Sequence, residues 1–166
     1  MIKKGKAWKF GDSISTDHIA PGRLFHLRTN LPEFAKHVLE DADPEFASNM
    51  QEGDFIVAGS NFGLGSSREH APKIIKIAGV SAVIAKSFAR IFFRNAINIG
   101  LPLIECDTDK INKDDILEVE FKAGIIKNIT QNTEIPITSL PDVMIKILNE
   151  GGLAEHIKKH GSFQLI

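Results

Sequence analysis

The chain has 166 residues, of which 43% are hydrophobic and 25% charged, as in a soluble globular domain with a sizeable core. Its net charge is -1, and its 20 basic residues are spread along the chain without a polybasic run, which argues against a nucleic-acid partner. No apolar stretch approaches the roughly 20 residues that span a bilayer. No apolar stretch of signal-peptide type follows Met1 to Lys9 either, so we expect a cytoplasmic protein with no membrane partner.

The first chemically dense part of the chain is the Asp-His segment, residues 11–19, with the sequence Gly-Asp-Ser-Ile-Ser-Thr-Asp-His-Ile. It places Asp12, Asp17, three hydroxyls and His18 in a predicted loop. Turn formation and helix capping are the simpler explanation of this composition, because Asp, Ser and Thr are the usual residues there. Arg28 follows, and a guanidinium suits bidentate binding of a carboxylate, although a single arginine is more often a solvated surface charge.

Residues 54–58 predict a buried strand that leads into a glycine-rich turn, and the stretch after the turn predicts a helix that a glycine closes beyond Ala78. Ser66 and Glu69 have the spacing of a capping box. Pro72 would then lie past the first turn and remove one helical hydrogen bond, so a later helix start with Pro72 near the first position is the alternative. Both of these helix starts place Ser66 and Ser67 at or before the first turn of the helix.

The rest of the chain alternates strand and helix and then changes to hairpins. Residues 80–85 predict a strand, 88–98 a helix and 101–106 another strand, which completes a β-α-β-α-β core with parallel strand pairs. Short β-prone segments then predict antiparallel hairpins, and two helices finish the chain; these elements cover residues 116–121, 125–129, 134–137, 141–149 and 153–160. The predicted fold class is α/β, a mixed sheet with flanking helices and short antiparallel hairpins.

The most informative segment is the glycine turn, residues 59–70, with the sequence Gly-Ser-Asn-Phe-Gly-Leu-Gly-Ser-Ser-Arg-Glu-His. Its glycines let backbone N–H groups approach a ligand closely, and the following helix N-terminus adds donors and partial positive charge. A bare anion-binding turn would not need Ser66, Ser67, Arg68 and two further ionisable groups in succession. This density of polar groups predicts chemistry as well as binding.

Familiar motifs do not explain the glycine turn. It lacks the Lys-Ser/Thr ending of a P-loop, and Arg68 stands where the dinucleotide fingerprint has its third glycine. No G-x-S-x-G nucleophile elbow occurs. A serine-hydrolase triad of Ser66 or Ser67 with His18 and Asp17 stays open as an alternative, because triads are defined by geometry.

Two residue types bear on metal binding. His156 and His160 have the i, i+4 spacing that can hold a metal on one helix face. No H-E-x-x-H glutamate accompanies them and they lie near a polar chain end, so we expect a solvated helix end and no metal site. The chain has a single cysteine, Cys106, which can form neither a disulfide within the chain nor a multi-cysteine iron–sulfur site.

Three segments together resemble a known family: the Asp-His segment, the stretch from Gly59 to Pro72, and Ser-Phe-Ala-Arg-Ile-Phe over residues 87–92. They look like the small subunit of 3-isopropylmalate dehydratase and homoaconitase and like the mobile last domain of aconitase, in order over essentially the whole chain. The resemblance implies a single swivelling β/β/α domain of aconitase type, residues 1–166, that closes over a large subunit. It also implies a [4Fe-4S] cluster held by three cysteines of that large subunit, with none bound by this chain.

The resemblance further implies a reaction, the reversible dehydration and rehydration of a hydroxy acid through an unsaturated intermediate. Its difficult step is removal of a weakly acidic C–H proton. By resemblance Ser66 is the base, as an alkoxide, while Ser67 and Arg68 bind the substrate and stabilise the developing charge. Asp17 and His18 match the second motif as an active-site and a substrate-binding residue. The iron would act as a Lewis acid on the leaving hydroxyl.

Elementary electrostatics agrees with the role implied for Ser66. A serine hydroxyl is a very weak acid in water, so it can serve as a base only in a concentrated positive potential. Arg68 and the N–H groups of the turn and helix are a plausible source of that potential. Without them Ser66 would be a capping serine.

The loop after the Asp-His segment is associated with substrate choice in this family, and here it is residues 23–29. An Arg28 that points into the cleft favours a distal carboxylate such as that of homoaconitate. With Arg28 turned outward, Leu24, Phe25 and Leu27 offer an apolar wall that suits isopropylmalate. The expected partners are therefore a large iron–sulfur subunit and a small hydroxy di- or tricarboxylic acid. A free-standing anion-binding or regulatory module with the same fold is the remaining alternative.

Overall fold

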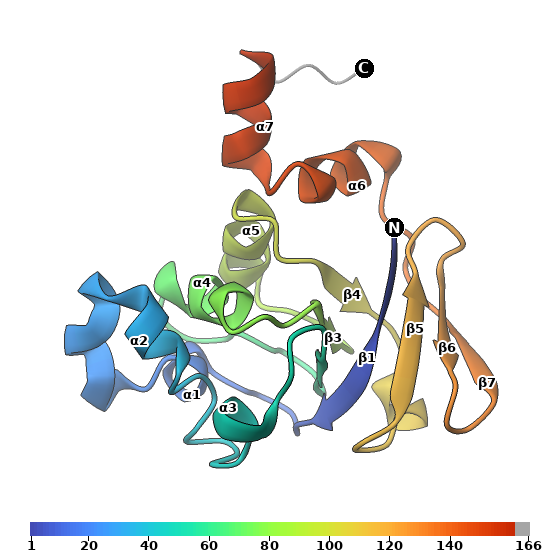
Figure 1. Ribbon diagram of the computed structural model, residues 1–166, viewed down its shortest axis with the longest axis horizontal. Coiled ribbons are helices and arrows are strands. Elements are labelled where there is room, and N and C mark those ends of the chain that lie inside the picture. The colour runs from blue at the N-terminus through green and yellow to red at the C-terminus, as the bar shows by residue number, and fades with distance from the viewer. Residues whose placement is uncertain (162–166) are drawn as a thin grey trace.

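Seven strands form one mixed sheet in the computed structural model, which describes residues 1–161 (Figure 1). The strands are β1 (Ile2–Lys9), β2 (Phe55–Val57), β3 (Ala82–Ala85), β4 (Leu103–Glu105), β5 (Ile116–Glu120), β6 (Ile125–Asn128) and β7 (Thr133–Pro136). Their order in the sheet is β4-β3-β2-β1-β5-β6-β7. The pairs among β1 to β4 are parallel, and those from β1 through β5 and β6 to β7 are antiparallel. The predicted α/β class with a mixed sheet is confirmed.

The predicted β-α-β-α-β core is the parallel half of this sheet. The two crossover helices are α4 (His70–Ile77) and α5 (Arg90–Asn98). The predicted capping box of Ser66 and Glu69 is wrong, because Glu69 is itself the N-cap residue and makes no side-chain capping hydrogen bond. Pro72 lies in the first turn of α4, where its missing N–H has no helical acceptor to lose.

No strand is predicted for residues 2–9, yet β1 lies in the middle of the sheet. Its four lysines mask the strand pattern, and only Ala7 and Trp8 of the strand are fully buried. The Asp54 side chain holds β1 in place through hydrogen bonds. Its carboxylate accepts hydrogen bonds from the backbone N–H of Lys6, 3.1 Å, and from the indole of Trp8, 3.0 Å. Contacts across nearly 50 residues thus complete a strand that local sequence does not reveal.

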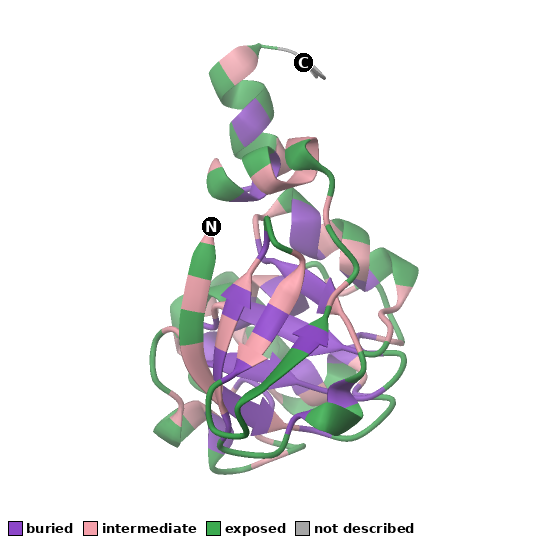
Figure 2. Ribbon diagram, turned by 90° about the vertical axis from the view of Figure 1, so that its right-hand side faces the viewer, coloured by how far each residue is buried: buried purple, intermediate pink, exposed green. Residues whose placement is uncertain are grey.

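The parallel strands bury both of their faces, in agreement with their continuous apolar runs (Figure 2). Alternate residues point to opposite sides of the sheet. Ile56 and Val83 pack in the core shared with the helices, whereas Phe55 and Ile84 pack in a second core with residues of the hairpin strands β5 to β7. The hairpins therefore cover the sheet face that the helices leave free.

Four short helical segments connect β1 to β2: α1 (Thr16–Ile19), η1 (Gly22–Thr29), α2 (Leu31–Ala35) and α3 (Phe46–Asn49). The Asp-His segment is thus not wholly a loop, since Ser15 caps the one-turn helix α1. A short turn η2 (Thr108–Lys110) follows β4. The α2 helix packs against α4, so residues 22–35 lie beside the glycine turn.

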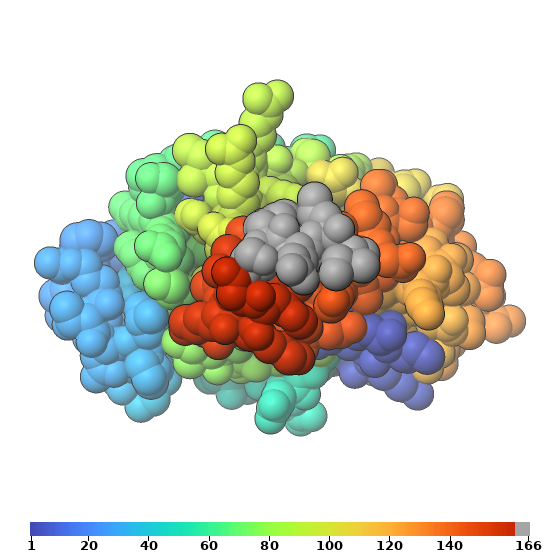
Figure 3. Space-filling model, turned by 90° about the horizontal axis from the view of Figure 1, so that it is seen from above, coloured from blue at the N-terminus to red at the C-terminus, as the bar shows by residue number. Residues whose placement is uncertain are grey.

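The chain ends in two helices, α6 (Asp142–Asn149) and α7 (Leu153–His160). Seen from above in Figure 3, the last helices lie over the middle of the molecule, and the light-blue segment near α2 forms one end. The predicted hairpins and terminal helices are confirmed to within a few residues. None of the helices within residues 1–161 has the length and apolar character needed to cross a membrane.

Candidate functional site

The glycine turn and the Asp-His segment lie side by side, because they follow the carboxyl ends of the neighbouring parallel strands β2 and β1. Backbone hydrogen bonds join them. The N–H of Thr16 donates to the carbonyl of Leu64, 2.9 Å, and the N–H of Gly63 donates to that of Ile14, 2.7 Å. The two polar constellations that the sequence places some 50 residues apart therefore form one surface.

Gly63 is essential to the path of the glycine turn. Its φ is +83°, and a Cβ there would lie 2.3 Å from Cγ of Phe92. A larger residue would be strained both by its backbone conformation and by this clash. The turn can therefore pack closely on α5 and still direct the next residues outward.

Arg68 is the centre of the site. Its Nη1 donates to Oδ1 of Asp17 and to the carbonyl of Ala20, each at 2.9 Å, and its Nε donates to Oγ of Ser66 at 3.1 Å. The same Asp17 oxygen accepts from the backbone N–H of Gly22, 3.1 Å. Within residues 1–161, Nη2 of Arg68 makes no hydrogen bond. One edge of the guanidinium is thus fixed, and one nitrogen stays available to a ligand.

Ser66 is held by its backbone, which leaves its hydroxyl exposed. Its carbonyl accepts from the N–H of Arg68, 2.7 Å, and from Oγ1 of Thr16, 3.1 Å. Thr16 is only 3% exposed, so this contact is a buried anchor beneath the turn. Ser66 and Ser67 themselves are exposed. The arrangement presents two adjacent hydroxyls, one of them in contact with a cation.

These groups open into a cavity of about 580 Å³. Its lining residues are Gly22, Phe25, Ser66, Ser67, Arg68, Glu69 and His70. The lining combines two hydroxyls and a guanidinium with the rings of Phe25 and His70, which contact each other. The cavity therefore suits a small ligand that has both an anionic and an apolar end.

His70 is a lining residue to which the sequence analysis assigns no role. Its ring stacks on Phe34, with centroids 5.5 Å apart, and meets the edge of Phe25 at 5.6 Å. Its Nε2 is buried and has no hydrogen-bond partner within residues 1–161. Burial, and secondarily the positive charges of Arg68, Arg28 and Lys73, lower the pKa of His70. The ring is therefore neutral at neutral pH and acts as an aromatic wall.

Two other predicted site residues lie beside this cavity rather than in its lining. His18 accepts a hydrogen bond at Nδ1 from the N–H of Ser15, 3.0 Å, so its neutral ring carries the proton on Nε2. It lines a separate cavity of about 430 Å³. The Arg28 guanidinium lies 4.4 Å above the Phe25 ring, and its Nη1 donates to the carbonyl of Phe25, 3.1 Å.

The serine-hydrolase triad is not formed. The hydroxyl of Ser66 contacts Arg68, Nδ1 of His18 contacts Ser15, and the Asp17 carboxylate contacts Arg68 rather than an imidazole. Within residues 1–161 no hydrogen bond joins the hydroxyl of Ser66 or of Ser67 to His18, so neither serine has a base of the triad type. This alternative is wrong.

Cys106 offers no ligand to an iron–sulfur cluster. It is partly buried just after β4, and burial is the main cause that raises its pKa to about 12, with Asp107 next. Burial therefore disfavours the thiolate that a metal needs, and one cysteine cannot hold a cluster that takes several cysteine thiolates. The residues of this chain do not fit a [4Fe-4S] cluster.

Comparison with known proteins identifies the family. Residues 28–109 match the aconitase C-terminal domain. A 3-isopropylmalate dehydratase small subunit 2 of Archaeoglobus fulgidus is 63% identical over 165 residues, covering 99% of this chain and all of the relative. A small subunit 1 of Thermotoga maritima is 62% identical, covering 96% of this chain and 97% of the relative.

The chain belongs to the 3-isopropylmalate dehydratase small-subunit family.

A solved structure agrees with this assignment. The crystal structure of a 3-isopropylmalate dehydratase from Methanocaldococcus jannaschii matches with a TM-score of 0.91 and 47% identity, covering 97% of this chain and 96% of the other. The family relation points to an iron–sulfur cluster on a large subunit, in keeping with the lone cysteine here. Small-subunit membership also implies a large-subunit partner.

The lowered pKa of His70 gives a first prediction. Because its pKa is lower in the folded than in the unfolded chain, His70 contributes stability that is complete above about pH 6.5 and is lost as the pH falls toward the folded pKa. His70→Phe keeps the stacking on Phe34 and removes the titrating group. Urea unfolding from about pH 7.5 to about pH 5.5 should then show a smaller loss of stability in the variant than in the wild type. Equal losses in the two proteins would contradict the assignment.

Proposed function

We propose that this chain acts as the small subunit of a 3-isopropylmalate dehydratase-type hydro-lyase and supplies its base, Ser66. One observation carries the proposal: the exposed Ser66 hydroxyl accepts a hydrogen bond from the Arg68 guanidinium inside a cavity. A donor fixed on a serine oxygen stabilises that oxygen once it is deprotonated. A serine that only caps a helix needs neither a hydrogen bond from an arginine nor an exposed hydroxyl. Ser66 does not cap α4.

The proton step can be written for this chain's own atoms. In its deprotonated form, Oγ of Ser66 takes the proton from the substrate carbon next to a carboxylate and becomes a hydroxyl. The electron pair of the C–H bond stays with the substrate and forms the double bond as the neighbouring hydroxyl leaves. Nε of Arg68, held by the Asp17 contact, stabilises the oxygen before the transfer.

Substrate binding is assigned to the groups that face the cavity and remain free. We assign Nη2 of Arg68 and the Ser67 hydroxyl to a substrate carboxylate. His18 lies outside the lining of this cavity, in a separate cavity, and is proposed to reach the substrate in the assembled enzyme as a donor from Nε2, because its Nδ1 accepts from the N–H of Ser15. The aromatic wall of Phe25 and His70 favours the apolar isopropyl group of 3-isopropylmalate over a third carboxylate.

The partner is proposed to be a large subunit that carries a [4Fe-4S] cluster. When bound there, the cluster supplies a Lewis acid for the leaving hydroxyl. No residue of this chain is assigned to it. The cavity on this chain is open, so an enclosed site requires a second surface. Supply of that surface by the large subunit explains why activity should need both chains.

Ser66→Ala tests the base assignment in the complex reconstituted with the large subunit of the same enzyme. The wild-type chain alone should show no turnover of 3-isopropylmalate, and the complex should be active. The variant should still assemble, because the backbone contacts of Ser66 remain. Its kcat should fall by about 10,000-fold, the upper end of what a positioned base contributes.

A matched control comes from the same turn. Ser60 is exposed there, and its hydrogen bonds within residues 1–161 are made by its backbone: its N–H donates to Asp12 and its carbonyl accepts from the N–H of Ser13. Ser60→Ala should therefore keep wild-type kcat. Near-normal turnover by Ser66→Ala would refute the base assignment. An assembled wild-type complex that is inactive on isopropylmalate, homoaconitate and citrate would instead favour an anion-binding or regulatory module.

Arg28→Leu tests the substrate preference. Only Nη1 of Arg28 is hydrogen-bonded within residues 1–161, and its guanidinium stacks on Phe25, which lines the cavity; its other nitrogens are therefore proposed to bind a distal carboxylate. Its removal should shift the ratio of kcat/KM values from homoaconitate toward 3-isopropylmalate by about 10-fold. Arg23→Leu is the control, because Arg23 lies in the same segment but pairs with Glu40 and Asp41. An unchanged ratio in Arg28→Leu would contradict a selector role.

A further inference from the structure

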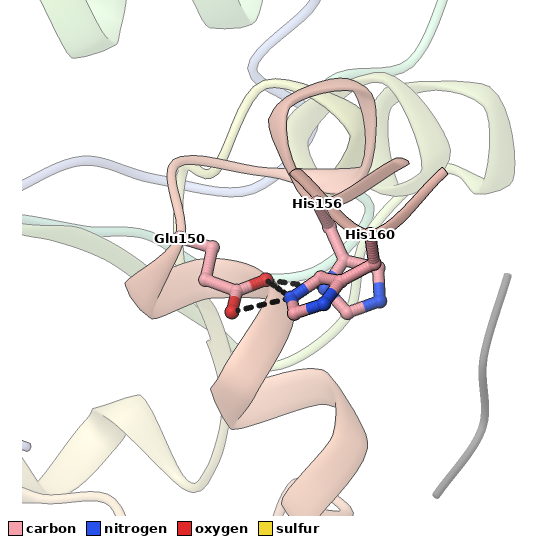
Figure 4. Close-up of side chains that lie close together, drawn as sticks. All are labelled: Glu150, His156 and His160. Carbon is pink, nitrogen blue, oxygen red and sulfur yellow. Dashed lines mark hydrogen bonds and ion pairs between the residues drawn. The ribbon is translucent and has the colours of Figure 1, made fainter. Parts of the chain in front are cut away.

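A second polar cluster lies in the C-terminal helices, far along the chain from the glycine turn (Figure 4). Both imidazoles of α7 contact the Glu150 carboxylate. Nε2 of His160 lies 3.0 Å and 3.2 Å from its two oxygens, and Nδ1 of His156 is in direct contact with Oε2. The ligand atoms of all three side chains lie within 4.8 Å of one another.

The expectation of a solvated helix end is wrong for these histidines. His156 is only 2% exposed, and the side chains of Glu150 and His160 are 12% and 28% exposed. The H-E-x-x-H pattern does not reveal Glu150, because that pattern places the glutamate directly after the first histidine, where this chain has Ile157. Glu150 instead follows the preceding helix, six residues before His156.

The chain reversal at Gly151 and Gly152 builds the cluster. Glu150 caps the end of α6, and α7 begins two residues after the first glycine. The φ of Gly152 is +111°, and a Cβ there would lie 2.4 Å from the carbonyl oxygen of Asn98. Only glycine can approach the end of α5 this closely, and the resulting turn folds both histidines back over Glu150.

We propose that Glu150, His156 and His160 form a divalent metal site of Zn²⁺ type that joins α6 to α7. Two imidazole nitrogens and one carboxylate are a ligand set that Zn²⁺ takes in proteins, with water or a further group completing a tetrahedron. Ligand atoms around tetrahedral Zn²⁺ lie roughly 3.3 Å apart, given bonds of about 2.0–2.1 Å. The separations between His160 and Glu150 are already close to that value.

The cluster has the further properties that a metal site needs. A metal binds imidazole as a neutral ligand and carboxylate as an anion, so these three side chains together would offer the ion a net charge of -1. Lys159 is the nearest competing cation, and its Nζ lies 3.4 Å from Oε1 of Glu150 on an exposed side chain that can swing away.

Isothermal titration of the full chain with ZnCl₂, after treatment with a chelator, tests the proposal. The wild type should bind one Zn²⁺ per chain, and bound Co²⁺ should show the visible absorption of a tetrahedral site. His160→Ala and Glu150→Gln should weaken binding by more than about 10-fold, the least that loss of an outer partner costs a metal site. Added Zn²⁺ should raise the unfolding temperature of the wild type but not of either variant.

His37→Ala is a matched control, because His37 also contacts a glutamate, Glu40 at 2.7 Å, but no second histidine joins that pair. It should bind Zn²⁺ as the wild type does. Absence of stoichiometric binding to the wild type, or binding of equal affinity to His160→Ala, would overturn the proposal and leave the cluster as a hydrogen-bonded link between helices.

Discussion

The candidate site depends on the hydrogen bonds of the Arg68 guanidinium. The guanidinium joins side chains 51 residues apart, Asp17 and Arg68, and also reaches the carbonyl of Ala20 and the hydroxyl of Ser66. A planar fork with donors in fixed directions can do this, whereas an ammonium on a flexible stem cannot. The sheet makes the contact possible, because parallel pairing of β1 with β2 brings the two loops to the same edge. The placement of Ser66 beside Arg68 and Asp17 is thus a consequence of strand order.

Sequence patterns predicted the parts of the fold that are encoded locally. The β-α-β-α-β core follows from apolar runs separated by glycines, and the hairpins from alternating residues. β1 was missed because its lysine-rich sequence becomes a strand only through its neighbours and the Asp54 contacts. The family motifs predicted Ser66, Arg68 and Asp17 as one site, and the structure brings them together. The sequence also offered Phe25 as part of an apolar wall, whereas the place of His70 in the cavity lining depends on how α2 packs on α4, which no local pattern records.

The polar side chains of the candidate site and of the C-terminal cluster lie in two separate parts of the fold. Polar chemistry is concentrated where β1 and β2 end, and the remaining sheet and its two apolar cores hold those loops in place. The C-terminal helices form a separate polar cluster around Glu150, assembled by a glycine reversal. In both places a buried anchor positions a more exposed group: Thr16 beneath Ser66, and His156 beside His160. Such pairs fix geometry without closing the site to a ligand.

The central claim is that the Arg68 fork stabilises the deprotonated Ser66 oxygen. The most direct test is the kcat of the Arg68→Lys complex at saturating 3-isopropylmalate, because lysine keeps the charge but cannot contact Asp17, Ala20 and Ser66 together. The account predicts a fall in kcat of about 100- to 1,000-fold, as for loss of one preorganised donor at a developing charge. A kcat close to that of the wild type would show that positive charge alone suffices and would contradict the account.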